Sequence, residues 1–176
     1  SYHSGDLPTD RPPHSFPAKL TVFLYERYSN GLGGFLILPC ELIEKNGTTL
    51  KELVLRYSKE WGLENGFIQW LSEENLFFNT LVDRIVTGYD GEFSLPYQDD
   101  MLDTCELYHL WVIEGPSSMA ARFPLKEAGL NVVWTDDVER YRTRKVRILN
   151  GAHTCLAPYA LLRGFETVKE CMDDPE

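Results

Sequence analysis

The run Gly33-Gly-Phe-Leu-Ile-Leu-Pro39 predicts a short buried strand, because an apolar segment after two glycines is typical of a strand covered on both faces. Before it, Lys19-Leu-Thr-Val-Phe-Leu-Tyr-Glu-Arg27 has the spacing of an amphipathic helix that ends before Asn30-Gly31. Pro17 suits the first turn of this helix, and Ser15 lies near its N-cap. Helix, glycine turn and buried strand form half of an α/β unit, so the sequence predicts an α/β fold.

Further along, the pattern stays mixed and then becomes helical. Asn46-Gly47 is expected to be a turn. A helix that begins near Val138 continues through Leu149 and toward Leu162, and Pro158 is expected to kink or break it. The other expected segments are helices at 48–61, 67–74 and 165–172, and extended chain at 77–86, 107–113 and 130–134.

Length and composition narrow the class of protein. The 176 residues suffice for one domain or for parts of two. A net charge of −10 argues against a nucleic-acid groove, which needs clustered Lys and Arg. No apolar run approaches the roughly 20 residues that span a bilayer, so no membrane segment is expected. The 4 cysteines form no Cys-x-x-Cys pair, which favours reduced thiols in a cytoplasmic protein and argues against a zinc site or a disulfide framework.

The segment Lys145-Val-Arg-Ile-Leu-Asn150-Gly-Ala-His153 brings an amine, a carboxamide and an imidazole together. In an α-helix, Asn150 lies about 140° around from Lys145 and His153 about 80°, which places all three in one broad sector. An amine that moves a proton, an amide that holds an oxyanion and an imidazole that orients a hydroxyl suit carbonyl reduction or alcohol oxidation. The competing interpretation is an amphipathic helix with a solvated lysine and a packed histidine.

Three blocks of the sequence carry a family resemblance. Asn79-Thr-Leu-Val-Asp-Arg-Ile-Val86 contains Val-Asp-Arg-Ile, Lys145 to His153 has the form K-x4-N-x2-H, and Cys40 to Gly47 ends in Asn-Gly. Together they resemble the mannitol dehydrogenase family of long-chain polyol dehydrogenases. Two more blocks, Ser15-Phe-Pro-Ala-Lys-Leu20 and Leu38-Pro-Cys-Glu-Leu-Ile43, are most similar to the hexuronate branch of that family.

Two positions depart from the family pattern. Thr87 stands two residues after the Ile of Val-Asp-Arg-Ile, where family members usually carry Pro or Ser. Glu41-Leu42 follows the cysteine where mannitol-type members have Asp-Asn, which favours the uronate branch.

The resemblance implies a division of the chain into two domains. Residues 1–137 are expected to be the C-terminal part of a Rossmann-type nucleotide-binding domain with a helical insertion, and 138–176 the start of a mainly helical substrate domain. The strand–G-x-G-x-x-G–helix element that cradles a pyrophosphate is not in the sequence, and Asn30 to Gly34 follows a helix instead of a strand. The chain is therefore expected to be a middle section of a longer enzyme.

The resemblance also implies a chemistry. It is NAD-dependent reduction of the keto group of a hexuronate, tagaturonate to altronate, without a metal. Lys145 is implied as the general acid/base, Asn150 and, less directly, Asn46 as donors to the carbonyl oxygen, and His153 as the residue that orients a substrate hydroxyl.

Several points stay open at the level of sequence. Asp83 and Arg84 form either a buried pair that supports the site or the cofactor, or a purely structural ion pair. Cys155 is expected to be a small packed thiol. The alternatives to a uronate reductase are a mannitol- or fructuronate-type dehydrogenase of the same family and a non-catalytic domain that keeps the fold. The sequence leaves open the oligomeric state and the identity of the residue that binds the substrate carboxylate.

Overall fold

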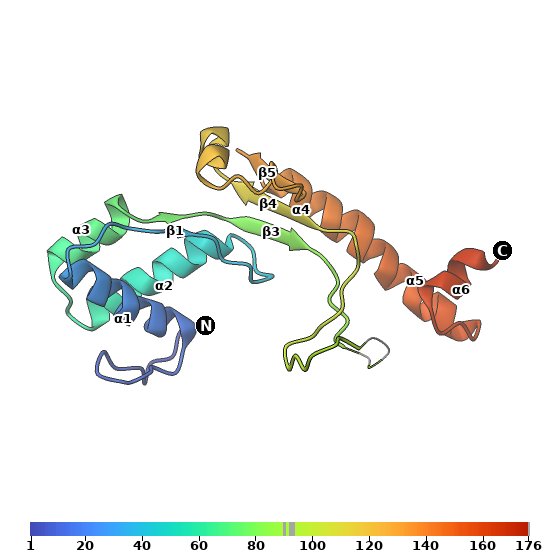
Figure 1. The fold of residues 1–176 in the computed structure, drawn as a ribbon, viewed down its shortest axis with the longest axis horizontal. Coiled ribbons are helices and arrows are strands. Elements are labelled where there is room, and N and C mark those ends of the chain that lie inside the picture. The colour runs from blue at the N-terminus through green and yellow to red at the C-terminus, as the bar shows by residue number, and fades with distance from the viewer. Residues whose placement is uncertain (90, 92–93, 176) are drawn as a thin grey trace. The chain divides into compact units, whose positions relative to one another are not determined.

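The computed structural model describes residues 1–89, 91 and 94–175, and the chain divides into two compact units, Ser1–Asp136 and Asp137–Glu176 (Figure 1). The first unit contains both helices and strands, and the described part of the second is helical. The α/β class predicted from the sequence is confirmed.

Helix α1 (Phe16–Ser29) begins as its local sequence predicts. The Ser15 hydroxyl is the N-cap and accepts a hydrogen bond from the Ala18 N–H, and Pro17 occupies the first turn. The helix ends before Gly31, which adopts a left-handed backbone with φ of 66°.

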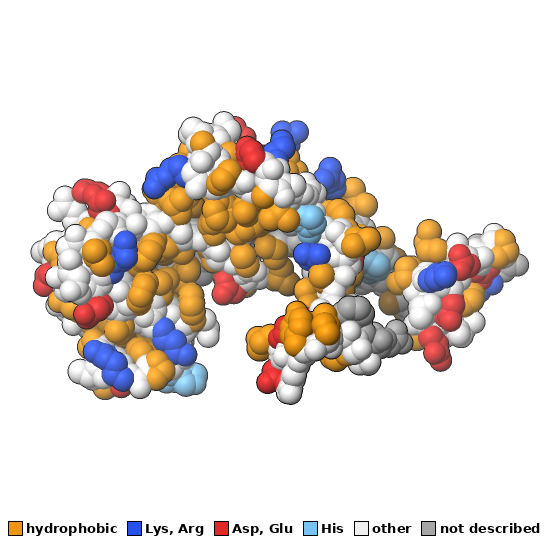
Figure 2. Space-filling view, in the orientation of Figure 1, with side chains coloured by type: hydrophobic (Ala, Val, Ile, Leu, Met, Phe, Trp, Pro, Cys, Tyr) orange, Lys and Arg blue, Asp and Glu red, His pale blue; other side chains and the backbone are white. Residues whose placement is uncertain are grey.

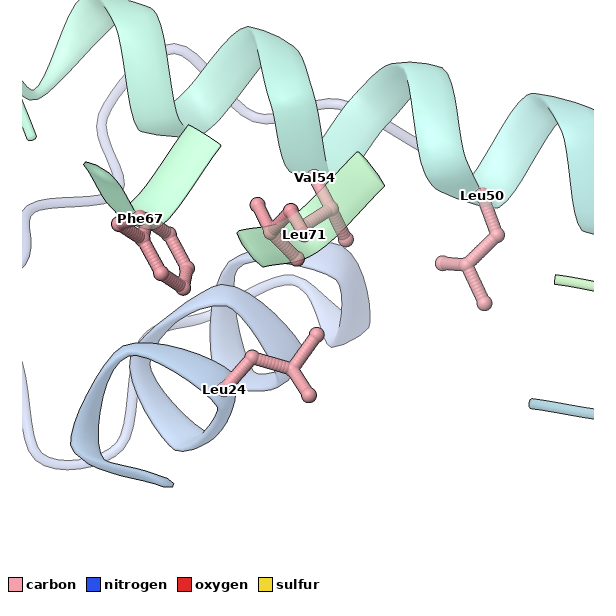
Figure 3. Close-up of a cluster of buried hydrophobic side chains, with 5 residues drawn as sticks. All are labelled: Leu24, Leu50, Val54, Phe67 and Leu71. Carbon is pink, nitrogen blue, oxygen red and sulfur yellow. The ribbon is translucent and has the colours of Figure 1, made fainter. Parts of the chain in front are cut away.

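Helices α2 (Asn46–Glu60) and α3 (Asn65–Glu73) pack with α1 around the first core of this unit. Figure 3 shows this core, in which side chains from the three helices point toward one another. Burial of such side chains stabilises the fold by about 1.5–3 kcal/mol each. The core residues are Leu24, Leu50, Val54, Phe67 and Leu71.

Strands β1 (Leu36–Ile37) and β2 (Leu76–Phe77) form a parallel pair beside this helical layer. The strand predicted at 33–39 is thus only two residues long. Two features limit its length. At its start, the Phe35 N–H donates to the Asn75 side-chain oxygen (3.0 Å) and not to a backbone carbonyl of a neighbouring strand. At its end, Pro39 has no N–H to donate.

A second sheet has the strand order β3-β4-β5. Strand β3 (Thr80–Asp83) is antiparallel to β4 (Leu110–Glu114), and β4 is parallel to β5 (Val132–Thr135). The 3₁₀-helix η1 (Ser117–Arg122) lies in the connection between β4 and β5 and contacts β5. The single extended segment predicted at 77–86 is wrong in detail, because the chain leaves one sheet after β2 and enters the other at β3.

The second core of the first unit lies on this sheet. Phe78, Ile113 and Val132 are buried there, and the Trp134 ring meets Phe78 edge-on with centroids 5.4 Å apart. Such a pair adds about 0.5–1.5 kcal/mol beyond its buried area.

The turn predicted at Asn46-Gly47 is wrong, since both residues belong to the first turn of α2. The Thr48 N–H donates to the Asn79 side-chain oxygen (2.9 Å), so a residue distant in sequence satisfies the helix start. A Cβ on Gly47 would lie 2.2 Å from the Phe78 carbonyl oxygen, so glycine is required for close approach rather than for a turn.

The second unit is built on consecutive helical segments. Helix α4 (Glu139–Arg144) leads into a π-helical turn, η2 (Lys145–Asn150), and then into α5 (Gly151–Leu162). Pro158 was predicted to kink or break the helix, and the break does not occur, because Pro158 lies inside α5. The helix continues at the cost of the hydrogen bond that the Thr154 carbonyl would accept.

Helix α6 (Val168–Asp173) begins three residues later than predicted, because Gly164 has a left-handed backbone (φ 80°) and Thr167 caps the helix with Glu170 in a capping box. Large apolar side chains reach the surface in both units (Figure 2). Within residues 1–89, 91 and 94–175, every helix falls short of the length and apolarity needed to cross a membrane.

Candidate active site

The three residues of the K-x4-N-x2-H block lie on the consecutive helical segments of the second unit. Lys145 is the first residue of the π-helical turn, Asn150 is the last, and His153 is in the first turn of α5. Lys145 is half-buried, and Asn150 and His153 are exposed. The structure therefore presents two of the three side chains to solvent and brings all three into one short helical stretch.

The π-helical turn changes the angles predicted from α-helical spacing. The Gly151 N–H donates to the carbonyl of Val146, five residues earlier, and also to that of Ile148. A helix that closes at five residues turns less per residue than an α-helix. The separation of about 140° expected between Lys145 and Asn150 in an α-helix does not apply here.

Basic side chains near Lys145 make interactions of their own. The Arg142 Nε lies 3.2 Å from Glu139 Oε1, and the Arg144 guanidinium lies 5.7 Å from the centre of the Tyr141 ring. The carboxylate of Glu139 offsets the positive charge that Arg142 contributes near Lys145.

A cavity of about 220 Å³ lies between α5 and α6 within the second unit, with His153 on its wall. Its other walls are mostly hydrocarbon, from Leu156, Phe165, Val168 and neighbouring side chains. A polyhydroxylated substrate would leave hydroxyl groups without partners there, so the cavity does not suit a sugar acid.

Asn46, predicted as a second carbonyl-binding amide, belongs to the first unit and is buried. Its Nδ2 donates to the carbonyls of Pro39 (3.0 Å), Glu41 (3.1 Å) and Thr80 (3.2 Å), and its Oδ1 accepts from the Thr80 N–H (2.8 Å). An amide has two protons, and here both are directed at acceptors of the protein. Asn46 thus ties α2 to the end of β1 and to β3, and its role toward a substrate stays a prediction.

Sequence reasoning missed Asn79 and Thr80, which complete this network. Asn79 Oδ1 accepts from the Thr48 N–H, and its Nδ2 donates to Glu114 Oε2 (2.7 Å). Thr80 donates its hydroxyl proton to the Pro39 carbonyl. Both residues begin the block Asn79 to Val86 that contains Val-Asp-Arg-Ile. That block was the sequence feature from which their role could have been predicted.

The residues of Val-Asp-Arg-Ile differ in burial. Asp83 is half-buried in β3, whereas Arg84 is exposed and donates through Nε to the Glu106 carbonyl (3.1 Å). Because Arg84 is exposed, the alternative of a buried Asp83–Arg84 pair is wrong. Whether these two residues support the site or only the structure stays a prediction. Cys155 is a free, exposed thiol, so the expected packed position is also wrong.

Comparison with known proteins identifies the family. Residues 10–127 match the family model of the mannitol dehydrogenase Rossmann domain, and residues 137–176 match that of the mannitol dehydrogenase C-terminal domain. Altronate oxidoreductases of Shigella flexneri and of Escherichia coli O6:K15:H31 (strain 536 / UPEC) are each 52% identical to the chain over 186 aligned positions, which cover 100% of it. The chain spans 38% of the length of these relatives.

Two solved structures share the fold. A D-sorbitol dehydrogenase in substrate-free form superposes with a TM-score of 0.74 and 26% identity, over 93% of this chain and 34% of that one. The mannitol 2-dehydrogenase of Pseudomonas fluorescens, solved as a ternary complex with NAD and D-mannitol, gives a TM-score of 0.62 at 23% identity, over 93% of this chain and 33% of that one. The chain described here belongs to the mannitol dehydrogenase family, with parts of both its Rossmann domain and its C-terminal domain.

Proposed function

We propose that the intact protein is an NAD-dependent oxidoreductase that reduces the keto group of a hexuronate, tagaturonate to altronate. The observation that carries this proposal is the 52% identity, over the whole chain, to proteins named altronate oxidoreductase. The placement of Lys145, Asn150 and His153 on one short helical stretch supports it.

Each of the three residues has a distinct task in the proposed reaction. Lys145 gives a proton to the oxygen of the substrate carbonyl as that oxygen gains negative charge. Asn150 donates an amide hydrogen bond to the same oxygen, and His153 orients a neighbouring hydroxyl. Asn46 is proposed as a further support of the site, through the backbone that its amide holds together.

The nicotinamide cofactor supplies the hydride in this proposal, but the residues of this chain do not fit a pyrophosphate cradle. The glycines of Asn30 to Gly34 lie between the end of α1 and the start of β1, the reverse of the strand-to-helix order that such a cradle needs. We therefore assign the cofactor cradle to a part of the intact protein beyond this chain, and the chain contributes the proton-transfer and carbonyl-binding groups. A cytoplasmic enzyme with a small uronate substrate fits this assignment.

The polyol dehydrogenases among the solved neighbours favour one rival, a dehydrogenase for an uncharged polyol or ketose. The direct experiment follows NADH oxidation by the intact protein on addition of tagaturonate, with the 176-residue chain alone as the comparison. The proposal predicts turnover by the intact protein, and neither turnover nor more than very weak NADH binding by the chain alone. Absence of tagaturonate turnover by the intact, folded protein would contradict the proposed function, and micromolar NADH binding to the chain alone would contradict the placement of the cofactor site.

A further inference from the structure

The spacing of the site residues coincides with a rare backbone conformation. The π-helical turn spans Lys145 to Asn150, and its boundaries are the two residues proposed to act on the substrate carbonyl. Regular α-helix resumes at Gly151. Single π-helical turns within α-helices are uncommon and occur frequently at functional sites.

The π-helical turn determines which residues share a face. In an α-helix, residues three and four apart are neighbours, and residues five apart diverge by about 140°. When the helix closes at five residues, residues five apart take over the stacked arrangement that residues four apart have in an α-helix. Lys145 and Asn150 therefore project from the same face.

The α-helical geometry after Asn150 adds the third group to that face. His153 follows Asn150 by three residues, which are neighbours along an α-helix. The Thr154 hydroxyl donates to the Asn150 carbonyl (2.9 Å) and fixes the backbone where the two helical geometries meet. One narrow face of the helix thus presents an amine, an amide and an imidazole.

We infer that the π-helical turn positions two side chains for the reaction. Val146 to Leu149 act as positioning residues, which direct the Lys145 amine and the Asn150 amide toward the same carbonyl oxygen of the substrate. The inference rests on the proposed roles of these two residues. The turn holds one residue more than an α-helix needs to bring its ends onto the same face. A K-x4-N spacing without the π-helical turn would direct the two groups to different sides.

The geometry is tested without any activity measurement, by pairs of histidines that bind Zn²⁺. In the full chain with His153→Ala and Cys155→Ser, one variant carries Lys145→His with Asn150→His, and a matched variant carries Arg147→His with Asn150→His. Two histidines on one helical face chelate a metal, and two on different faces do not. We expect the five-apart pair to bind Zn²⁺ at least about tenfold more tightly than the three-apart pair in calorimetry, because residues three apart are neighbours in an α-helix and diverge when the helix closes at five residues. Equal binding, or tighter binding by the three-apart pair, would overturn the inference.

A second measurement needs no substitution and so does not depend on a variant that folds. Nuclear Overhauser contacts in the unsubstituted chain should link the α-proton of Lys145 to the amide proton of Asn150, five residues later. Contacts from Lys145 to residue 149 at the strength typical of an α-helix, with none to Asn150, would overturn the inference as well.

The consequence for the reaction is tested in the intact protein by changing the spacing. Deletion of Ile148 leaves Lys145 and Asn150 four residues apart, on one face of a regular α-helix, and turnover should stay within about tenfold. Insertion of one alanine after Arg147 sets them six apart, and turnover should fall at least about 100-fold with NADH affinity unchanged. A deletion as damaging as the insertion would contradict the positioning role. The zinc experiment decides the geometry even if tagaturonate proves not to be the substrate.

Discussion

Lys145 and Asn150 are the two ends of one π-helical turn, and this relationship links the fold of the second unit to its proposed chemistry. A proton donor and an amide donor serve one carbonyl oxygen only when both reach it from the same side. The turn meets that requirement with backbone geometry alone, on a helix that continues on both sides of it.

Replacement of Lys145 by alanine in the intact protein should lower turnover at least about 100-fold, because a positioned general acid contributes about 10²–10⁴ in rate. Affinity for NADH should change little, and small amines added to the assay should restore part of the rate. Lys169→Ala, on the exposed face of α6, is the matched control and should keep turnover near that of the unsubstituted protein. Near-normal turnover of Lys145→Ala between pH 6 and 9 would remove this lysine from the mechanism.

Replacement of Asn46 by alanine should destabilise the chain by at least about 2 kcal/mol, because the Thr80 N–H and the Pro39 carbonyl lose a buried partner. The control is Asn65→Ala, since Asn65 also begins a helix and precedes a glycine but is exposed. Its effect should stay within about 0.5 kcal/mol. Urea unfolding of both variants measures the difference, and equal losses would show that the buried amide network does not hold α2 to β3.

Replacement of Gly47 by alanine should cost more than about 2 kcal/mol in the free energy of unfolding, because the new Cβ would lie 2.2 Å from the Phe78 backbone oxygen and a backbone must move. Gly66→Ala is the control within α3, where the new Cβ meets only the hydroxyl end of the Tyr28 side chain, which shifts at less cost than a backbone. We expect Gly66→Ala to be near neutral, since alanine also favours the helix. Thermal unfolding that ranks the two variants the other way would contradict the packing described for Gly47.

Asp6 should give the chain a pH-dependent stability. Burial raises the pKa of this carboxyl, but hydrogen bonds from Ser15, the His14 N–H and the Tyr57 hydroxyl outweigh burial and lower it from 3.8 to about 2. A pKa lowered in the folded state stabilises the protein above the unfolded value, and that stabilisation is lost as the pH falls toward the folded value. The stability advantage of the unsubstituted chain over Asp6→Asn should therefore be full above about pH 4 and shrink between pH 4 and 2.

Urea unfolding at several pH values measures this advantage. Tyr57→Phe removes one of the donors to Asp6 and should reduce the pH dependence without abolishing it. A stability difference between the unsubstituted chain and Asp6→Asn that is constant from pH 2 to 7 would contradict the account of Asp6.

Local signals were read correctly from the sequence where local contacts decide the structure. Ser15 and Pro17 lie within one turn of the helix that they begin, so their cap and first-turn positions were predictable. The prediction of a turn at Asn46-Gly47 was wrong because an Asn-Gly pair usually marks a turn, whereas here the Thr48 N–H at the helix start donates to Asn79, which lies just before β3 and 31 positions away.

The candidate site was also predicted only in part from the sequence. The residue types and spacing of Lys145, Asn150 and His153 indicated carbonyl chemistry and a family. The π-helical turn between the first two was not predictable, because a hydrophobic pattern reports the period of 3.6 residues and does not reveal one extra residue in a single turn. The length of β1 also depended on a distant side chain, that of Asn75.

Steady-state assays of the intact protein with tagaturonate, fructuronate and fructose test the proposed function most directly. A site that pairs with a carboxylate leaves buried donors or charge unsatisfied when an uncharged hydroxymethyl group takes its place, so kcat/KM with NADH should be at least about 100-fold higher for tagaturonate than for fructose. Fructuronate keeps the carboxylate and differs in stereochemistry, and a clear preference for it would assign the sister activity. A kcat/KM for fructose equal to that for tagaturonate would contradict the uronate proposal.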